Sequence, residues 1–173
     1  LITVPCCAAC NSAFASEDEY FRLVLSSLLG RSPAGDQIWE RKVVPRSIKR
    51  LPADVDQILH SCKDVTLETE NGPTEAVAFR VDPDRMYRYA VRLTKGLLAH
   101  HFPDYDYTAT TFDVRPISHT KKNLDELATY RDMLKYDERG DAVFRYRYGL
   151  TDTRASGMWL FVFYDTIEIL VCH

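Results

Sequence analysis

The stretch GMWLFVFYD, residues 157–165, decides the fold of this chain of 173 residues. Every residue from Met158 to Tyr164 is apolar or aromatic, so the stretch has no polar face of its own. An apolar run of this length, bounded by turn residues, is typical of a strand that is buried on both faces. We therefore expect residues 157–165 to form a central strand of a sheet.

The segments beside this stretch are expected to supply further strands. In AVFRYRYGL, residues 142–150, aromatic residues alternate with arginines, which is the period of a strand with one covered and one exposed face. IEILVC, residues 167–172, is expected to pair with the central strand. The chain is thus predicted to turn to β structure after Gly140.

The middle of the chain predicts a short helix followed by a pair of strands. Asp54–Cys62 has the composition of a short helix. VTLETENGPTEAVAFRV, residues 65–81, is consistent with two strands around the turn at residues 71–73, although the proline in that turn departs from a simple two-residue hairpin. We expect a small sheet to begin here.

A longer helix is predicted to start at Asp82 and Pro83, because aspartate caps helix starts and proline suits the first helical position. The apolar stripe of this helix consists of Met86, Tyr89, Ala90, Leu93 and Leu97. A second helix with a weaker pattern is expected over Lys121–Lys135. The fold class is therefore α+β: a small, mostly antiparallel sheet packed with two or three helices, preceded by a cysteine arm and a helix.

The N-terminal part of the chain is expected to form an arm that is joined to this domain by a linker. Ser16-Glu17-Asp18-Glu19 fits a capping box, which predicts a helix over residues 17–29 that ends at Gly30. Residues 31–53 contain several prolines and a glycine and favour irregular structure with a short strand. We divide the chain into an arm and helix at 1–30, a linker at 31–53 and an α+β domain at 54–173.

Composition excludes several classes of protein. No apolar run approaches the roughly 20 residues of a membrane span, and the first ten residues lack the features of a secretory signal, so a cytoplasmic location is expected. The five cysteines are odd in number and crowded towards one end, which favours reduced thiols. A formal charge of −3 provides no general attraction to phosphate, so any nucleic-acid role would rest on a local basic face. A processed or truncated product is one interpretation of a chain that begins with Leu1.

Cys7-Ala-Ala-Cys10 is the most specific chemical signal in the chain. Two thiolates at this spacing can face one tetrahedral zinc, but they supply two ligands of the four that zinc requires. Two buried thiols are the plain alternative. A redox pair ranks lower, because such a motif should open a helix and the expected cap, Ser16, lies further along the chain.

The wider motif resembles the second half of HNH-type endonuclease domains. The resemblance covers residues 4–21, where Cys7-x-x-Cys10-Asn11 follows Val4-Pro5 and precedes an acidic and aromatic run. It implies that Cys7 and Cys10 are structural zinc ligands of a treble-clef-like arm. It also implies that Asn11 is the last catalytic residue of the HNH signature. The rest of the chain looks like an α+β extension found after such arms, to which we attach no activity.

The family's chemistry needs a histidine base upstream of this element and a catalytic divalent metal. Residues 1–5 contain no histidine and no first C-x-x-C, so the chain as given is expected not to cleave DNA by that mechanism. The missing zinc ligands have two further sources: a second chain, or Cys172 and His173 of the same chain. Truncation, degeneration and chance similarity all remain open explanations of the motif.

Two groups of basic residues are candidates for phosphate contacts. The first lies within ten residues and consists of Arg41, Lys42, Arg46, Lys49 and Arg50. The second follows one face of the helix after Pro83 and consists of Arg85, Arg88, Arg92 and Lys95. Both groups are also consistent with solvated surfaces that pair with nearby acids such as Glu40, Asp82 and Asp84, and the neighbouring aromatics are consistent with core positions.

Histidines offer a weaker catalytic hypothesis. His100 and His101 precede Asp104 and Asp106, which is a candidate metal or hydrolytic cluster, while His60 and His119 have no triad spacing. We therefore interpret the chain as the C-terminal portion of an HNH-endonuclease-like protein, associated with nucleic acid, holding half a zinc site and not catalytically complete. A non-enzymatic and dimeric protein-interaction domain is the alternative, and an unrelated enzyme that uses the histidine cluster is the third.

Overall fold

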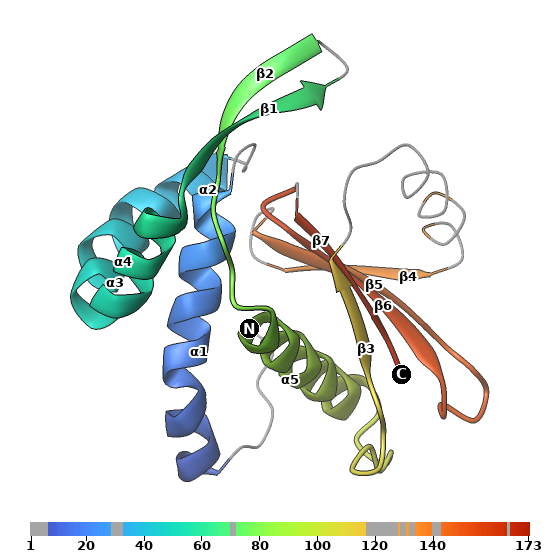
Figure 1. Ribbon diagram of the computed structural model, residues 1–173. Coiled ribbons are helices and arrows are strands. Elements are labelled where there is room, and N and C mark those ends of the chain that lie inside the picture. The colour runs from blue at the N-terminus through green and yellow to red at the C-terminus, as the bar shows by residue number, and fades with distance from the viewer. Residues whose placement is uncertain are drawn as a thin grey trace.

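The structure is a computed structural model that describes residues 7–28, 33–69, 72–116, 128, 131, 134–139, 143–165 and 167–173 (Figure 1). The helices are α1 (Ala8–Ser27), α2 (Pro33–Ile38), the π-helical turn η1 (Trp39–Val43), α3 (Val44–Arg50), α4 (Pro52–Ser61) and α5 (Pro83–His101). The strands are β1 (Lys63–Thr69), β2 (Gly72–Ala78), β3 (Asp113–Pro116), β4 (Lys135–Arg139), β5 (Phe144–Leu150), β6 (Gly157–Phe163) and β7 (Ile167–Cys172). Helices and antiparallel sheets coexist, so the predicted α+β class is confirmed.

The main sheet has five antiparallel strands in the order β3-β7-β6-β5-β4. The central strand is β6, as the apolar run GMWLFVFYD predicts. Trp159 of β6 lies between Tyr148 of β5 and Val171 of β7 in the register of the sheet. The predicted strands on both sides of β6 are therefore confirmed, whereas the sequence did not predict β4.

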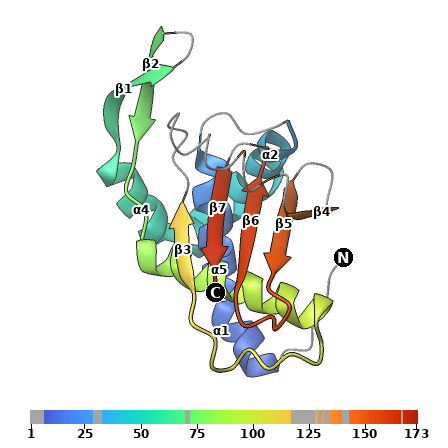
Figure 2. The same cartoon turned by 90° about the vertical axis from the view of Figure 1, so that its right-hand side faces the viewer.

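The principal core lies between one face of this sheet and the helices α1 and α5. Figure 2 shows α5 and α1 crossing behind the strands. The ring of Phe21 from α1 stacks on Tyr89 of α5 with 3.6 Å between centroids, and it meets the ring of Phe163 edge-on at 5.2 Å. Trp159 and Phe161 are fully buried in the same cluster. The first helix is thus part of the core of the domain.

The other face of the sheet carries a smaller apolar cluster. Leu160 and Val162 of β6 are buried there, with Leu134 packed against them. The carboxylate of Glu168 on β7 is buried and forms an ion pair with Arg131. The predicted helix over Lys121–Lys135 falls largely outside the described residues, and its last residue begins β4.

The predicted strand pair and its flanking helices are confirmed. Strands β1 and β2 form a separate two-stranded antiparallel ribbon that projects from the body of the molecule (Figure 1). The carboxylate of Asp82 caps α5 by accepting hydrogen bonds from the amides of Asp84 and Arg85, at 2.9 and 3.1 Å. Proline occupies the start of α5, as the sequence indicates.

The predicted start of the first helix is wrong. α1 begins at Ala8, because the sulfur of Cys7 caps the helix by accepting a hydrogen bond from the Cys10 amide at 3.2 Å. Ser16 therefore lies inside the helix and caps nothing. The expected terminator Gly30 falls outside the described residues, and α1 ends at Ser27.

The prediction of irregular structure with a short strand over residues 31–53 is also wrong. Residues 33–50 are helical, and the prolines mark helix starts instead of loops. Pro33 opens α2, Pro45 lies in the first turn of α3 and Pro52 opens α4. A first-turn proline costs no hydrogen bond, because the first amides of a helix have no partner within it. The domain boundaries at 30 and 53 stay a prediction.

Replacing Phe21 tests the inclusion of α1 in the core. Phe21→Ala removes a ring that is 4% exposed, and we expect the free energy of unfolding to fall by about 3–4 kcal/mol. Leu59→Ala is the control, because that side chain is 64% exposed and its loss should change the free energy by about 0.5 kcal/mol or less. Urea unfolding measures both, and equal losses would contradict this placement of α1.

Candidate functional site

Cys7 and Cys10 lie together at the first turn of α1. Both side chains are exposed, and the sulfur of Cys7 is held by the amide of Cys10. Hydrogen bonds from the Cys10 side chain and then from its backbone amide lower the pKa of the Cys7 thiol. A thiolate is the form that binds metal or attacks as a nucleophile, and a lowered pKa increases the fraction of Cys7 in this form.

Asn11 follows the two cysteines in the same turn of α1. Its amide donates a hydrogen bond to the Cys7 carbonyl at 3.0 Å, and its side chain is exposed. The cysteines and the asparagine that carry the family resemblance therefore share one exposed helix end. The argument that ranked a redox pair lower is wrong, because the cysteines do open a helix; the residues before Cys7 are outside the described part of the chain.

Within the described ranges, no three His, Cys, Asp or Glu side chains gather into a metal site. Cys172 and His173 thus do not complete a site with Cys7 and Cys10 in this chain. Burial raises the pKa of the Cys172 thiol, which makes it a poorer metal ligand than Cys7. Two thiols are at most half of the ligands of a tetrahedral zinc, so further ligands would have to come from undescribed residues or from a second chain.

The arginines of α5 form an ion-pair network with α1 and α4. Arg85 donates to Glu17 of α1 at 2.7 Å and to Asp54 of α4 at 2.6 Å, while its guanidinium lies 3.7 Å from the centre of the Tyr20 ring. Arg88 donates to the second oxygen of Glu17 at 3.1 Å. These contacts join three helices, so Arg85 has a structural role.

The remaining cations of this helix face are also engaged. Arg92 forms an ion pair with Asp18 and lies over the Phe14 ring, and Lys95 lies 5.5 Å from the Phe112 ring. Three members of the second predicted basic group, Arg85, Arg88 and Arg92, therefore contact α1, whereas Lys95 contacts Phe112. The acids expected as partners were Asp82 and Asp84, but the partners observed lie on other helices.

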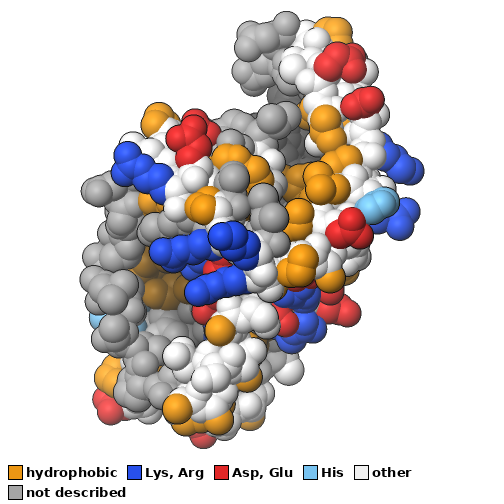
Figure 3. Space-filling model, turned by 90° about the vertical axis from the view of Figure 1, so that its left-hand side faces the viewer, with side chains coloured by type: hydrophobic (Ala, Val, Ile, Leu, Met, Phe, Trp, Pro, Cys, Tyr) orange, Lys and Arg blue, Asp and Glu red, His pale blue; other side chains and the backbone are white. Residues whose placement is uncertain are grey.

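The first basic group lies on a different face. Arg41 on η1 and Arg46, Lys49 and Arg50 on α3 are exposed. Among the described residues, none of these four forms an ion pair. Lys42 lies in the same turn, η1. Figure 3 shows basic side chains gathered on the face of the molecule formed by the N-terminal helices.

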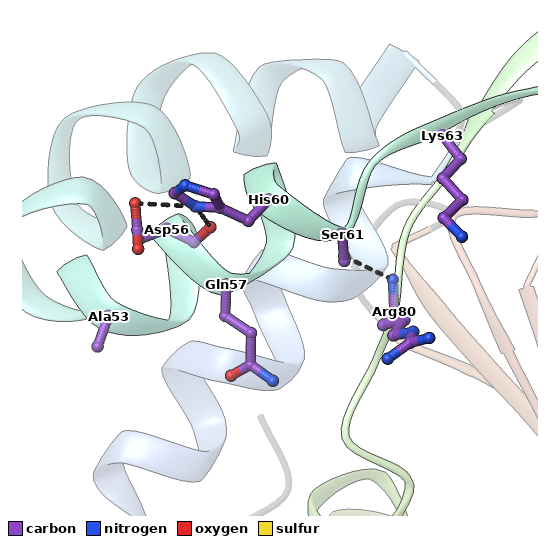
Figure 4. Close-up of a pocket in the computed structure, with 7 residues that line it drawn as sticks. All are labelled: Ala53, Asp56, Gln57, His60, Ser61, Lys63 and Arg80. Atoms are coloured by element: carbon purple, nitrogen blue, oxygen red, sulfur yellow. Dashed lines mark hydrogen bonds and ion pairs between the residues drawn. The ribbon is translucent and has the colours of Figure 1, made fainter.

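An open pocket of about 560 Å³ lies where α4 meets the ribbon (Figure 4). Its polar lining includes Lys63 at the start of β1 and Arg80 just after β2. Nδ1 of His60 lies 3.2 Å from the Asp56 carboxylate, and both side chains are highly exposed. The sequence analysis missed this pocket, although the pairing of residues 65–81 as two strands is a signal that brings Lys63 close to Arg80.

The predicted cluster of His100, His101, Asp104 and Asp106 does not form a group of ligands in the described structure. Nε2 of His101 lies 2.8 Å from the Tyr146 hydroxyl, and its ring stacks on Tyr148 among the core aromatics. The Asp106 carboxylate instead accepts hydrogen bonds from the amide and hydroxyl of Thr108. Packing accounts for the position of His101 in the described structure, and the metal cluster stays a prediction; His119 lies outside the described residues.

Comparisons of the chain with protein-family models, with curated proteins and with solved structures found no match in any of the three. In the described part of the chain, no helix has the length and apolar character needed to cross a membrane.

Replacing Arg85 tests the network that holds α1. Burial alone would raise the pKa of Glu17, but hydrogen bonds from Arg85 and Arg88 outweigh it and lower that pKa below 4.5. A lowered folded pKa stabilises the fold above the unfolded value and loses this contribution as the pH falls through the folded value. We expect Arg85→Met to cost about 1–3 kcal/mol at neutral pH and to reduce the further loss below pH 4.5.

Urea unfolding over a pH series measures both effects. Arg115→Met is the matched control, because Arg115 pairs with Asp113 at 2.6 Å on an exposed edge strand. Such surface pairs contribute about 0–1 kcal/mol. An Arg85→Met variant with the stability and acid profile of the Arg115→Met variant would contradict the structural role of the network.

Proposed function

We propose that this chain is the C-terminal portion of an HNH-endonuclease-like protein, in which Cys7 and Cys10 bind one structural zinc together with ligands from elsewhere. The observation that carries the proposal is the exposed dithiol in the first turn of α1, where the Cys7 sulfur accepts the Cys10 amide hydrogen. Asn11 takes the position that the resemblance gives to the last catalytic residue. The proposal assigns metal binding and nucleic-acid association to this chain, and no cleavage.

The exposure of the first part of α1 supports the same proposal. From Cys7 to Ser16 each side chain is exposed, apart from the half-buried Phe14. The helix enters the core from Glu19 onwards. This leaves the first turns of α1, with Cys7 and Cys10, accessible to a metal ion.

Nucleic-acid association rests on the face that carries Arg41, Arg46, Lys49 and Arg50. These cations have no acidic partner among the described residues, in contrast to Arg85, Arg88 and Arg92. Unpaired cations on one face attract a phosphate backbone even where the net charge of the chain is negative. A steep loss of affinity with added salt is the expected signature.

Cobalt binding tests the metal proposal. We expect Co²⁺ to produce a thiolate-to-metal charge-transfer band in the full chain. With protein in excess, one metal should recruit two chains, because a tetrahedral ion needs four ligands and one chain supplies two. Cys7→Ser/Cys10→Ser should abolish the band, and Cys62→Ser is the control because Cys62 is exposed but distant in sequence. A band that survives in the double variant, or no band in the wild type, would overturn the proposal.

A dimeric interaction domain is the second candidate, and the exposed apolar side chains favour it. Among the described residues these are Leu59, Leu67, Val77, Val81 and Tyr87, of which the first four lie on α4, on the ribbon or just after it. A two-stranded ribbon is marginally stable by itself. One face of the ribbon carries Val77 with Asp64 and Glu75, which complements the cations of α3 in a second copy.

Oligomeric state tests this second candidate. Sedimentation equilibrium should detect a dimer that weakens with salt, and Val77→Lys should convert it to a monomer. Leu67→Lys is the matched control, because Leu67 lies on the opposite face of the ribbon and is similarly exposed. A monomeric wild type, or equal effects of the two substitutions, would exclude this interface.

A further inference from the structure

The pocket between α4 and the base of the ribbon carries two cations, Lys63 and Arg80, that form no ion pair with a described acid. Lys63 and Arg80 are brought together because the strand that begins at Lys63 pairs with the strand that ends two residues before Arg80. Both side chains line the pocket, Lys63 from the start of β1 and Arg80 from the segment after β2, and Gln57 lines it from α4 (Figure 4). Both cations are exposed, and neither forms an ion pair in the described structure.

The backbone of the pocket is held in place by Ser61. The Ser61 hydroxyl donates to the carbonyl of Ile58 at 2.8 Å and accepts the amide hydrogen of Arg80 at 2.9 Å. This bridge ties the end of α4 to the end of β2. Arg80 therefore leaves the ribbon from a defined position beside Lys63.

Neither of the nearby acids that the structure describes forms an ion pair with these two cations. Asp56 also lines the pocket, but its carboxylate lies 3.2 Å from Nδ1 of His60, and Asp54 accepts a hydrogen bond from Arg85. Asp64 follows Lys63 in the strand, so its side chain lies on the opposite face of the ribbon.

The backbone carbonyls at the end of α4 do not need Lys63 or Arg80 as hydrogen-bond donors. Those of Ile58 and Leu59 already accept hydrogen bonds from Ser61 and from the Cys62 amide. The two cations thus remain available to a ligand.

We propose that this pocket binds a phosphate group of a nucleic-acid backbone, with Lys63 and Arg80 as the charged donors and Gln57 as a neutral donor. This inference rests on the proposed nucleic-acid association and gives it a second contact, separate from Arg46 and Lys49 on α3. An arginine guanidinium and a lysine ammonium are the usual partners of phosphate oxygens. The volume of the pocket, about 560 Å³, falls within the roughly 300–1,000 Å³ of small-ligand sites.

The experiment compares two double variants of the full chain in binding to a fluorescent DNA duplex. Lys63→Ala/Arg80→Ala removes the pocket cations. Lys135→Ala/Arg115→Ala is the matched control, because it removes one lysine and one arginine from edge strands of the main sheet. Circular dichroism establishes that both variants are folded, and anisotropy between about 50 and 200 mM salt gives the affinity and its salt slope.

Loss of one phosphate contact should reduce the magnitude of the salt slope by about 0.9 and weaken binding about eightfold at 0.1 M salt. The control should bind as the wild type does. If the pocket variant keeps the wild-type affinity and slope while the wild type binds DNA, the pocket is not a backbone contact and the inference fails, although the proposed function survives.

Inorganic phosphate separates the possible sources of the ligand. In the wild type it should shift the backbone amide resonances of Ser61, Lys63 and Arg80, and in the pocket variant the amides at the same three positions should not shift. If the wild type does not bind DNA at low salt but phosphate shifts these resonances, nucleic-acid association fails and the pocket takes free phosphate or a nucleotide. If neither DNA nor phosphate acts at the pocket, the inference is overturned.

Discussion

The guanidinium of Arg85 is the contact on which the arrangement of the helices depends. It binds Glu17 and Asp54 at once and lies over the Tyr20 ring, so one side chain of α5 fixes both α1 and α4. The Tyr20 hydroxyl in turn accepts the amide hydrogen of Asp82 at 2.7 Å, at the start of α5. This geometry sets the level at which Phe21 stacks on the core. Cys7 and Cys10 lie at least about two turns before Glu17 on α1, so the position of α1 also determines where these two thiols lie.

Local signals in the sequence were sufficient for the sheet and for α5. The apolar run of β6 has no polar face to expose, and that property alone requires neighbours on both sides. Asp82 and Pro83 define the start of α5 through backbone geometry that depends on few distant contacts. The same kind of signal misled at residues 33–50, because a proline at a helix start and a proline in a loop look alike until the partners of the helix are known.

In the candidate sites, too, local sequence patterns predict contacts between neighbours in the chain but not contacts between distant segments. Cys7, Cys10 and Asn11 are adjacent in the sequence, so their proximity was predictable, but the start of α1 was not, since a cysteine sulfur acts as the cap where serine or aspartate is usual. The pairing of Arg85 with Glu17 spans 68 residues and no spacing rule reaches it. Lys63 and Arg80 come together only because β1 pairs with β2, so no local pattern in the sequence indicates the pocket.

The distribution of carboxylates explains how an acidic chain can present a basic face. Glu17, Asp18 and Asp54 form ion pairs with the arginines of α5. Glu19 is buried against Arg22 and the Ser47 hydroxyl, which lies 2.9 Å from its carboxylate. These acids therefore count in the formal charge of −3 but contribute little field at the surface of α3. Because Ser47 of α3 is tied to Glu19, the same contact that buries this acid also orients α3. Arg46 and Lys49, which lie near Ser47 on α3, are left exposed. The electrostatic field at this surface therefore depends on which charges are paired and not on the net charge of the chain.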